Sequence, residues 1–180
     1  VKREHLGGFN KGAALQVGDK LSSLLEQSQT QTINISVYPE LIRTYNSKET
    51  IHCRFIPACQ WSLFSVDDQQ RFLNQTYRIS SQSDRMGVRL EGEKLKPYND
   101  GIISEGIALG AIQVPPAGQP IVLMRDRQTI GGYPKLGTVL STDIDKIGQA
   151  MPGQLIQFQL SDVQTAYEER VQRERFFSSE

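Results

Sequence analysis

The 180-residue sequence has little cysteine and little histidine. Its two cysteines, Cys53 and Cys59, have five residues between them and no second pair follows. That spacing is a poor zinc pattern, and reduced thiols of a cytoplasmic protein are the simpler interpretation. The two histidines, His5 and His52, have no metal partner at ligand spacing. With so few histidines, no metal site and no Ser–His–Asp catalytic arrangement are expected.

The sequence also lacks an excess of charge of either sign. Lys and Arg total 20, and Asp and Glu total 20. This balance gives no electrostatic footprint for nucleic acid or for an anionic membrane. No apolar run is long enough to cross a bilayer, and the opening "VKREHLGGFN" has no signal-peptide core. We expect a cytoplasmic protein whose sequence is entered partway along a longer chain.

Several cofactor motifs are missing. There is no GxxxxGK[ST] phosphate loop, no GxGxxG after a strand and no GxSxG elbow. None of the three methionines is followed by lysine, so the Met-Lys-Met site at which biotin is attached is absent. If ATP or biotin serves this protein, another chain carries it.

Most of the apolar residues that are present alternate with polar ones, which predicts β-strands. "QLIQFQLS" is the clearest case, because Ile156, Phe158 and Leu160 alternate with glutamines. About eight short strands are predicted, at residues 32–39, 51–57, 76–80, 86–92, 105–114, 120–125, 136–140 and 154–161.

Helix signals are fewer. Residues 65–75 begin with Ser65 as a plausible N-cap and two aspartates, and residues 141–153 repeat this pattern with Thr142 as the cap. The tail from residue 161 opens with Ser161 and Gln164 at capping-box spacing. Its arginines and glutamates are expected to form i,i+4 pairs on a solvated face. Strands without βαβ alternation predict one mostly-β domain over residues 1–180, a mixed barrel with two or three helices.

Polar residues collect where three strand patterns begin or end. In "SSQSDRMGVRLEG", Ser83, Asp84 and Arg85 precede a strand. Asp84 is a candidate for local turn chemistry, whereas Arg85 is a candidate carboxylate clamp. In "ISEGIALGAIQVPPAGQP", Glu105 and Gln113 flank a strand that glycines interrupt. Barrel closure and close approach of a ligand both account for those glycines.

The third segment is "DRQTIGGYP", residues 126–134. If Val122 and Met124 face the barrel interior, strand alternation carries Asp126 and Gln128 inward as well. A carboxylate there either finds a partner or has its pKa raised toward that of a general base. Two glycine N–H groups could form an anion-binding nest, with a tyrosine beside it. The alternative is a glycine turn with an Asp–Arg surface pair.

These segments resemble one family. "LGGFNKGAALQVGD", "SSQSDRMGVRLEG", "ISEGIALGAIQVPPAGQPIVLMRDRQTIGGYPKLGTV" and "MPGQLIQF" are similar to the allophanate hydrolase subunit 2-like group, also called KipA or the C subunit of 5-oxoprolinase. That group includes the carboxyltransferase domain of urea carboxylase. The resemblance runs from about Leu6 to about Leu160, and Ile130 and the "NKG" at residues 10–12 depart from the common pattern.

The resemblance implies a cyclophilin-like β-barrel and the C-terminal half of a two-domain chain. It implies one component of a bacterial ATP-dependent 5-oxoprolinase, which works with two further components, one of the KipI type and one of the LamB/YcsF type. Biotin-dependent carboxyl transfer to urea or a related amide is one alternative, and non-catalytic regulation of a KipI-type kinase inhibitor is another. The expected catalytic residues are Asp126 and Glu105, and the expected substrate-binding residues are Ser83, Arg85, Gln113, Arg127, Gln128, Gly131, Gly132 and Tyr133.

Overall fold

The computed structural model describes residues 16–20, 49–98 and 101–178. By its internal contacts the chain divides into two units, Val1–Thr44 and Tyr45–Glu180. In the first unit the described residues form a turn, in which the Asp19 carboxylate accepts the Gln16 N–H at 2.8 Å. The strand predicted at residues 32–39 lies outside the described residues, and the single domain predicted over residues 1–180 stays a prediction.

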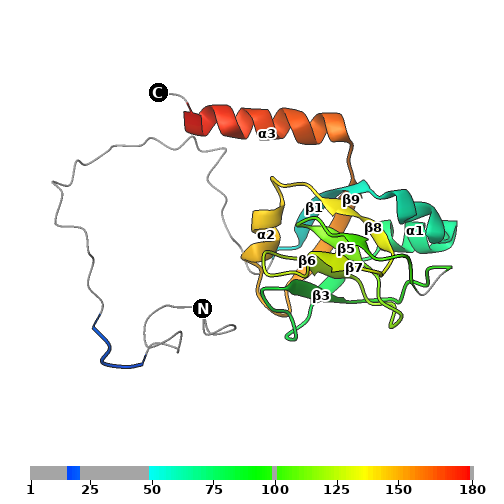
Figure 1. The fold of residues 1–180 in the computed structure, drawn as a ribbon, viewed down its shortest axis with the longest axis horizontal. Helices are drawn as coiled ribbons and strands as arrows, with labels where there is room; N and C mark the ends of the chain where they lie inside the picture. The colour runs from blue at the N-terminus through cyan, green and yellow to red at the C-terminus, as the bar shows by residue number, and fades with distance from the viewer. Residues whose placement is uncertain (1–15, 21–48, 99–100, 179–180) are drawn as a thin grey trace. The chain divides into compact units, whose positions relative to one another are not determined.

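The second unit is mostly β, as predicted. Seven strands close into a barrel in the order β1-β8-β5-β6-β3-β2-β9, and β4 pairs separately with β7 (Figure 1). The described elements are β1 Ile51–Pro57, the 3₁₀ helix η3 Cys59–Leu63, α1 Val66–Asn74, β2 Tyr77–Ile79, β3 Gly87–Glu91, β4 Glu105–Gly106, β5 Ala111–Gln113, β6 Ile121–Leu123, β7 Ile130–Gly131, β8 Lys135–Val139, α2 Ile144–Gly148, β9 Leu155–Leu160 and α3 Val163–Ser178.

Strand β1 closes the barrel. It pairs in parallel with β9, where Cys53 lies opposite Phe158, and antiparallel with β8, where Phe55 lies opposite Val139. Gly137 of β8 allows a close approach, because a Cβ there would lie 2.3 Å from the Ile56 carbonyl oxygen. Any larger residue at position 137 would push these two strands apart.

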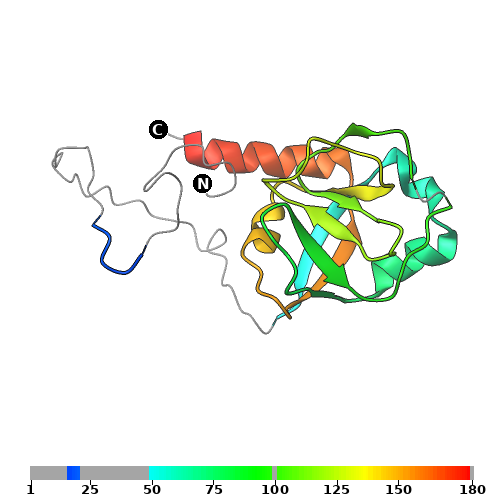
Figure 2. The same cartoon turned by 60° about the horizontal axis from the view of Figure 1, so that its bottom comes forward.

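Aromatic side chains fill the barrel beneath α1. Phe72 of α1 stacks on Phe158, with ring centroids 5.0 Å apart, and meets Phe55 edge-on at 5.3 Å. Phe55 and Phe72 are fully buried. Helix α1 closes one end of the barrel and α2 lies at the other end (Figures 1 and 2). The aromatic core therefore fixes the orientation of α1 on the barrel.

The start of α1 is as predicted, and the other two predicted helix starts are wrong. Ser65 Oγ accepts the Asp68 N–H at 3.1 Å. Thr142 does not cap α2, because that helix has no side-chain cap and the Thr142 hydroxyl donates to Glu169. Asp162, not Ser161, accepts the Thr165 N–H at 2.8 Å before α3. An aspartate caps as well as serine and also favours the positive helix end, so it prevails there.

The strand predicted over residues 105–114 is broken in two. A turn interrupts it, in which the Ala111 N–H donates to the Ala108 carbonyl and Gly110 has a φ of 84°. The strand predicted over residues 120–125 ends at Leu123 and turns at Arg125. Asp126 therefore lies in a turn and not on the inward face of an extended strand. Among the described residues, no helix has the length and apolar character needed to cross a membrane.

A partly buried charge cluster attaches α3 to the barrel. The Arg54 guanidinium of β1 binds the Asp143 carboxylate (Nε–Oδ2 2.9 Å) and the Glu169 carboxylate of α3 (Nη2–Oε2 2.8 Å). We call Arg54, Asp143 and Glu169 the Arg54 clamp. Glu169 thus leaves the solvated face predicted for it, whereas Arg170 and Glu174 form the expected i,i+4 pair.

Hydrogen bonds set the charge state of Asp143. This residue is fully buried, and burial by itself favours the protonated acid. Hydrogen bonds from Arg54 and Lys146 outweigh that effect and lower the pKa of Asp143 to about 2. Asp143 is therefore ionised near neutral pH and holds two cations in place.

Replacing this carboxylate should destabilise the fold in a pH-dependent way. The native pKa of Asp143 is about 2, so its charge stabilises the fold above the unfolded pKa of about 4 and this contribution is lost as the pH falls toward 2. Asp143→Asn should lower the free energy of unfolding by about 2 kcal/mol near neutral pH. The difference from the wild type should shrink between about pH 4 and pH 2, as measured by urea denaturation.

Asp145→Asn is the matched control. Its carboxylate bridges Arg173 at the surface, with both side chains more than two-fifths exposed. The expected loss is below about 1 kcal/mol. Equal effects of the two substitutions would contradict the special role of Asp143.

Candidate functional site

A small ribbon joins two of the three polar segments. In it β4 pairs antiparallel with β7, with Glu105 opposite Gly131 and Gly106 opposite Ile130. We call these four residues the rim ribbon. Two backbone hydrogen bonds extend the pairing, from the Ile102 N–H to the Gly132 carbonyl at 2.8 Å and from the Ile107 N–H to the Thr129 carbonyl at 2.9 Å.

Charged and amide side chains meet beside the rim ribbon. The Glu105 carboxylate lies 2.6 Å from Lys135 Nζ and also accepts a hydrogen bond from the Gln60 amide. Gln60 Oε1 in turn accepts the Lys135 N–H at 3.0 Å. The Lys135 side chain is only 12% exposed. A lysine this deeply placed keeps its charge most readily next to a carboxylate.

These contacts determine the form in which Glu105 acts. The hydrogen bonds from Lys135 and Gln60 lower the pKa of Glu105 below its usual range. A carboxylate with a lowered pKa is a weak general base near neutral pH. It remains a strong hydrogen-bond acceptor and a fixed negative charge, so Glu105 is suited to orient a donor group of a ligand.

Gln113 lies on the neighbouring strand. It is 2% exposed and stands opposite Lys135 in the β5–β8 register, next to an irregularity at Ile112. Its Nε2 group is buried and has no hydrogen-bond partner among the described residues. A buried donor without a partner is unusual in a native fold and requires an explanation.

The first and third polar segments also come together. Arg85 binds Asp126 with two contacts, Nε–Oδ2 at 3.1 Å and Nη2–Oδ1 at 3.3 Å. The Asp126 N–H donates to the Arg85 carbonyl at 3.0 Å, so backbone and side chains join the two turns. The Asp126 side chain is 28% exposed and that of Arg85 is 72% exposed. The acid has found a partner, which is the first of the two outcomes expected for it.

Three further residues of these segments hold backbone groups. Ser83 Oγ accepts the N–H of Arg89, in the middle of β3, at 3.0 Å. Asp84 accepts the N–H groups of Met86 and Gly87, which is the local turn chemistry considered for it. Arg127 donates from Nε to the Ile107 carbonyl at 3.1 Å and from Nη1 to the Met124 carbonyl. Arg127 therefore ties the loop after β6 to the segment after β4.

The paired glycines do not form the expected nest. Neither Gly131 nor Gly132 has a positive φ, and Gly131 belongs to β7. Their role is close packing, because a Cβ on Gly131 would lie 2.6 Å from Ile107 Cδ1. Gln128 is exposed and Tyr133 is 43% exposed.

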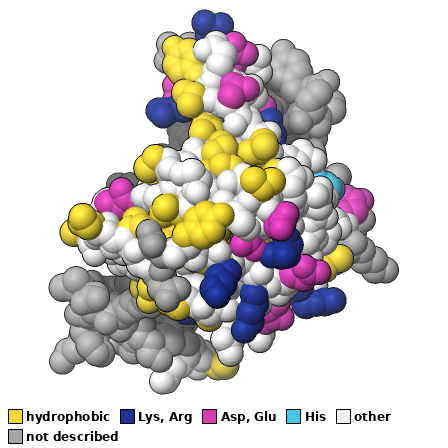
Figure 3. All heavy atoms as spheres, turned by 90° about the vertical axis from the view of Figure 1, so that its right-hand side faces the viewer, with side chains coloured by type: hydrophobic (Ala, Val, Ile, Leu, Met, Phe, Trp, Pro, Cys, Tyr) yellow, Lys and Arg dark blue, Asp and Glu magenta, His cyan; other side chains and the backbone are white. Residues whose placement is uncertain are grey.

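Apolar side chains are also exposed on the side of the molecule where α1 lies, beside side chains of both charges (Figure 3).

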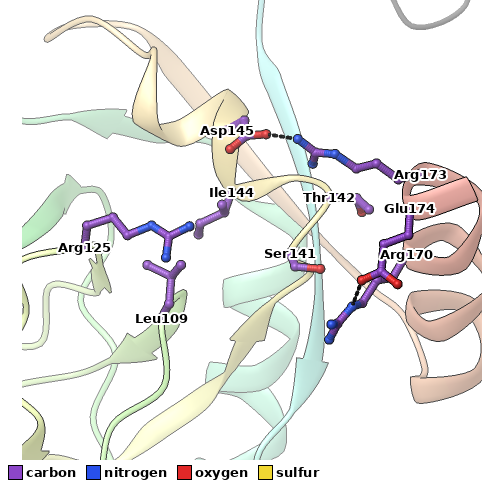
Figure 4. A pocket seen from close by; sticks show the side chains of 9 residues that line it. All are labelled: Leu109, Arg125, Ser141, Thr142, Ile144, Asp145, Arg170, Arg173 and Glu174. Carbon is purple, nitrogen blue, oxygen red and sulfur yellow. Dashed lines mark hydrogen bonds and ion pairs between the residues drawn. The ribbon is translucent and has the colours of Figure 1, made fainter. Parts of the chain in front are cut away.

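A separate cleft of about 400 Å³ lies between α2 and α3 (Figure 4). Arg170 and Arg173 extend toward it from α3, and Arg125 reaches it from the loop after β6. Arg173 is paired with Asp145 and Arg170 with Glu174. None of the predicted site residues lines this cleft, so we place the candidate site at the rim ribbon.

Sequence reasoning missed Lys135 and Gln60. Lys135 follows directly after "DRQTIGGYP" and is the first residue of β8, so a charged residue at a strand start was the available signal. Gln60 lies in η3 and gave none. Among residues 16–20, 49–98 and 101–178, no three His, Cys, Asp or Glu side chains gather as they would around a metal ion.

The family follows from comparison with known proteins. The family described as "Carboxyltransferase domain, subdomain A and B" matches residues 1–160. The chain belongs to this family. The match contains all three polar segments and the rim ribbon, and it ends before α3.

Relatives carry two kinds of name. The C subunit of 5-oxoprolinase from Haemophilus influenzae is 33% identical over 165 residues, which are 91% of this chain and 50% of that protein. "Urea amidolyase" of Saccharomyces cerevisiae is 26% identical over 170 residues, which are 86% of this chain and 9% of that protein. The crystal structure of the K. lactis urea amidolyase shares the fold, with a TM-score of 0.64 and 24% identity over 74% of this chain and 9% of that one. The chain thus spans about half the length of the 5-oxoprolinase relative.

Removing the lysine charge should change the titration of Glu105. In Lys135→Met the carboxylate loses its strongest partner, so its pKa should rise toward the usual value of about 4.3. Carboxyl-detected NMR titration of Glu105 measures this shift. Lys96→Met, at an exposed position, is the control and should leave Glu105 unchanged. An identical Glu105 titration in wild type and Lys135→Met would show that the pair does not form in solution.

Proposed function

We propose that this chain is part of an ATP-dependent 5-oxoprolinase, a hydrolase that opens the cyclic amide 5-oxoproline to glutamate. The observation that carries the proposal is the set of side chains beside the rim ribbon. There the motif segments of this family bring together the Glu105 carboxylate, the Lys135 ammonium group and the Gln113 amide, whose donor has no partner among the described residues. The 33% identity to a protein named as the C subunit of 5-oxoprolinase supports this choice of reaction.

The partners and ATP belong to the same proposal. A relative named as one subunit of an enzyme implies other subunits, and we assign these to the KipI type and the LamB/YcsF type. The sequence has no phosphate-binding loop, so the residues of this chain do not fit ATP by that route. ATP is therefore assigned to the partner subunits, and the assembled enzyme to the cytoplasm.

The contacts of each residue in the structure determine the role proposed for it. Asp126, held by Arg85, is proposed to orient or deprotonate the attacking group, and Glu105 with Lys135 to position the substrate. Tyr133 and Gln128 are exposed and are proposed to line the approach. Ser83 and Arg127 already bind backbone groups, so their contribution to binding is the shape of the two turns.

Biotin-dependent carboxyl transfer to urea is the second candidate. The name of the matching family and the yeast urea amidolyase favour it. The chain has no Met-Lys-Met attachment site, so its residues would bind biotin only when a carrier chain brings it. Urea and 5-oxoproline both contain a small planar amide, and the polar side chains beside the rim ribbon suit either substrate.

Reconstitution tests the two reactions against each other. This chain, with the partner subunits, should release glutamate from 5-oxoproline only when ATP is present. Asp126→Ala should lower kcat by about a hundredfold if Asp126 transfers a proton. Asp67→Ala, on an exposed position of α1, is the control and should keep wild-type turnover.

Two results would count against the proposal. Unchanged turnover in Asp126→Ala would remove Asp126 from the chemistry. Carboxylation of urea that requires a biotin carrier, without release of glutamate from 5-oxoproline, would replace the hydrolase by the carboxyltransferase.

A further inference from the structure

The buried amide of Gln113 has an unused donor. Its Nε2 group makes no hydrogen bond within the described residues, and the residue is only 2% exposed, so little water reaches it. Replacing a buried glutamine by an apolar residue of the same shape usually stabilises a fold when the amide has no partner. A side chain that weakens the apo fold is the kind of residue that a ligand site retains.

The groups around Gln113 are complementary to an amide. Lys135 stands opposite Gln113 on β8 and binds the Glu105 carboxylate. Glu105 stands opposite Gly131 on β7, and a Cβ on Gly131 would lie 3.1 Å from Gln113 Nε2. Because opposite residues of an antiparallel pair point to the same face, the Glu105 side chain, an acceptor, and the Gln113 amide, a donor, lie on one face of the rim ribbon.

The rim ribbon covers this donor. Each of its strands has two residues, and Gly106 and Ile130 are exposed. Arg127 holds the segment after β4 by its bond to the Ile107 carbonyl. Such a short, exposed pairing opens at low free energy compared with the barrel strands. Opening would give a small ligand access to the Gln113 amide.

We propose that Gln113 and Glu105 together read the cis-amide edge of the substrate. In a lactam or in urea, the N–H and the C=O lie on one edge, whereas a trans peptide bond directs them to opposite sides. The Gln113 Nε2 donates to the carbonyl oxygen, and the Glu105 carboxylate accepts the N–H. This inference rests on the proposed function and names the substrate class of the same site.

Three probes test recognition of the amide edge. 5-Oxoproline contains the lactam and a carboxylate, and 2-pyrrolidone contains the lactam alone. L-Proline keeps the ring and the carboxylate but has a charged secondary ammonium group in place of the amide. Calorimetric titration of the 180-residue chain should show binding of both lactams at millimolar concentrations. L-Proline should bind more weakly than 5-oxoproline by about tenfold or more.

Gln113→Met gives the decisive comparison. The variant should melt at a higher temperature than the wild type without ligand, and it should lose the preference for 5-oxoproline over L-proline. Gln159→Met, on an exposed position of β9, should match the wild type in ligand preference. Hydrogen exchange at Ile107 and Gly131 should slow when a lactam is bound to the wild type.

Several results would overturn the inference. One is a wild-type chain that binds neither lactam, or that binds L-proline as well as 5-oxoproline. Another is Gln113→Met with a lower melting temperature and unchanged preference, which would show that the amide has a structural partner. If the reconstituted wild-type enzyme releases no glutamate from 5-oxoproline but the chain still binds lactams, that result would count against the proposed reaction and not against this inference.

Discussion

The structure depends on β1, which joins β8 to β9 and so closes the barrel. Its inward residues, Cys53 and Phe55, are fully buried against the aromatic core. Its outward residue Arg54 holds Asp143 and the helix after β9. One strand therefore fixes the sheet, the core and the last helix at once. Because β8 is held by β1, Lys135 at its start has a fixed position relative to Gln113.

The charged side chains beside the rim ribbon lie where the desolvation of a charge costs little free energy. Glu105 is two-fifths exposed, so its charge keeps part of its hydration, and Lys135 beside it is compensated by a direct ion pair. The Asp126–Arg85 pair lies at the surface in the same way. Gln113 alone among these groups is buried without a partner in the described residues. The site thus combines two ion pairs, which are already formed, with one amide donor that can still bind a ligand.

Alternation of apolar and polar residues predicted most of the barrel, because strands with one buried face keep a period of two. Two of the motif segments also lie together in the structure, since residues 105–106 and 130–131 pair with each other. The pattern did not reveal that the segment from Glu105 to Gln113 bends, because a turn with Gly110 in the left-handed region is decided by packing. Lys135 and Gln60 were missed because their contact with Glu105 depends on long-range register. Thr142 was misjudged because Glu169, from a distant helix, takes its hydroxyl.

The Arg54 clamp also bears on where this folding unit stops. The family match ends at residue 160, yet Glu169 supplies one of the two carboxylates that neutralise Arg54 and Lys146. A barrel without Glu169 would keep two cations around the single buried Asp143 carboxylate. The boundary that electrostatic balance sets for this fold therefore lies at least nine residues beyond the boundary that sequence similarity sets.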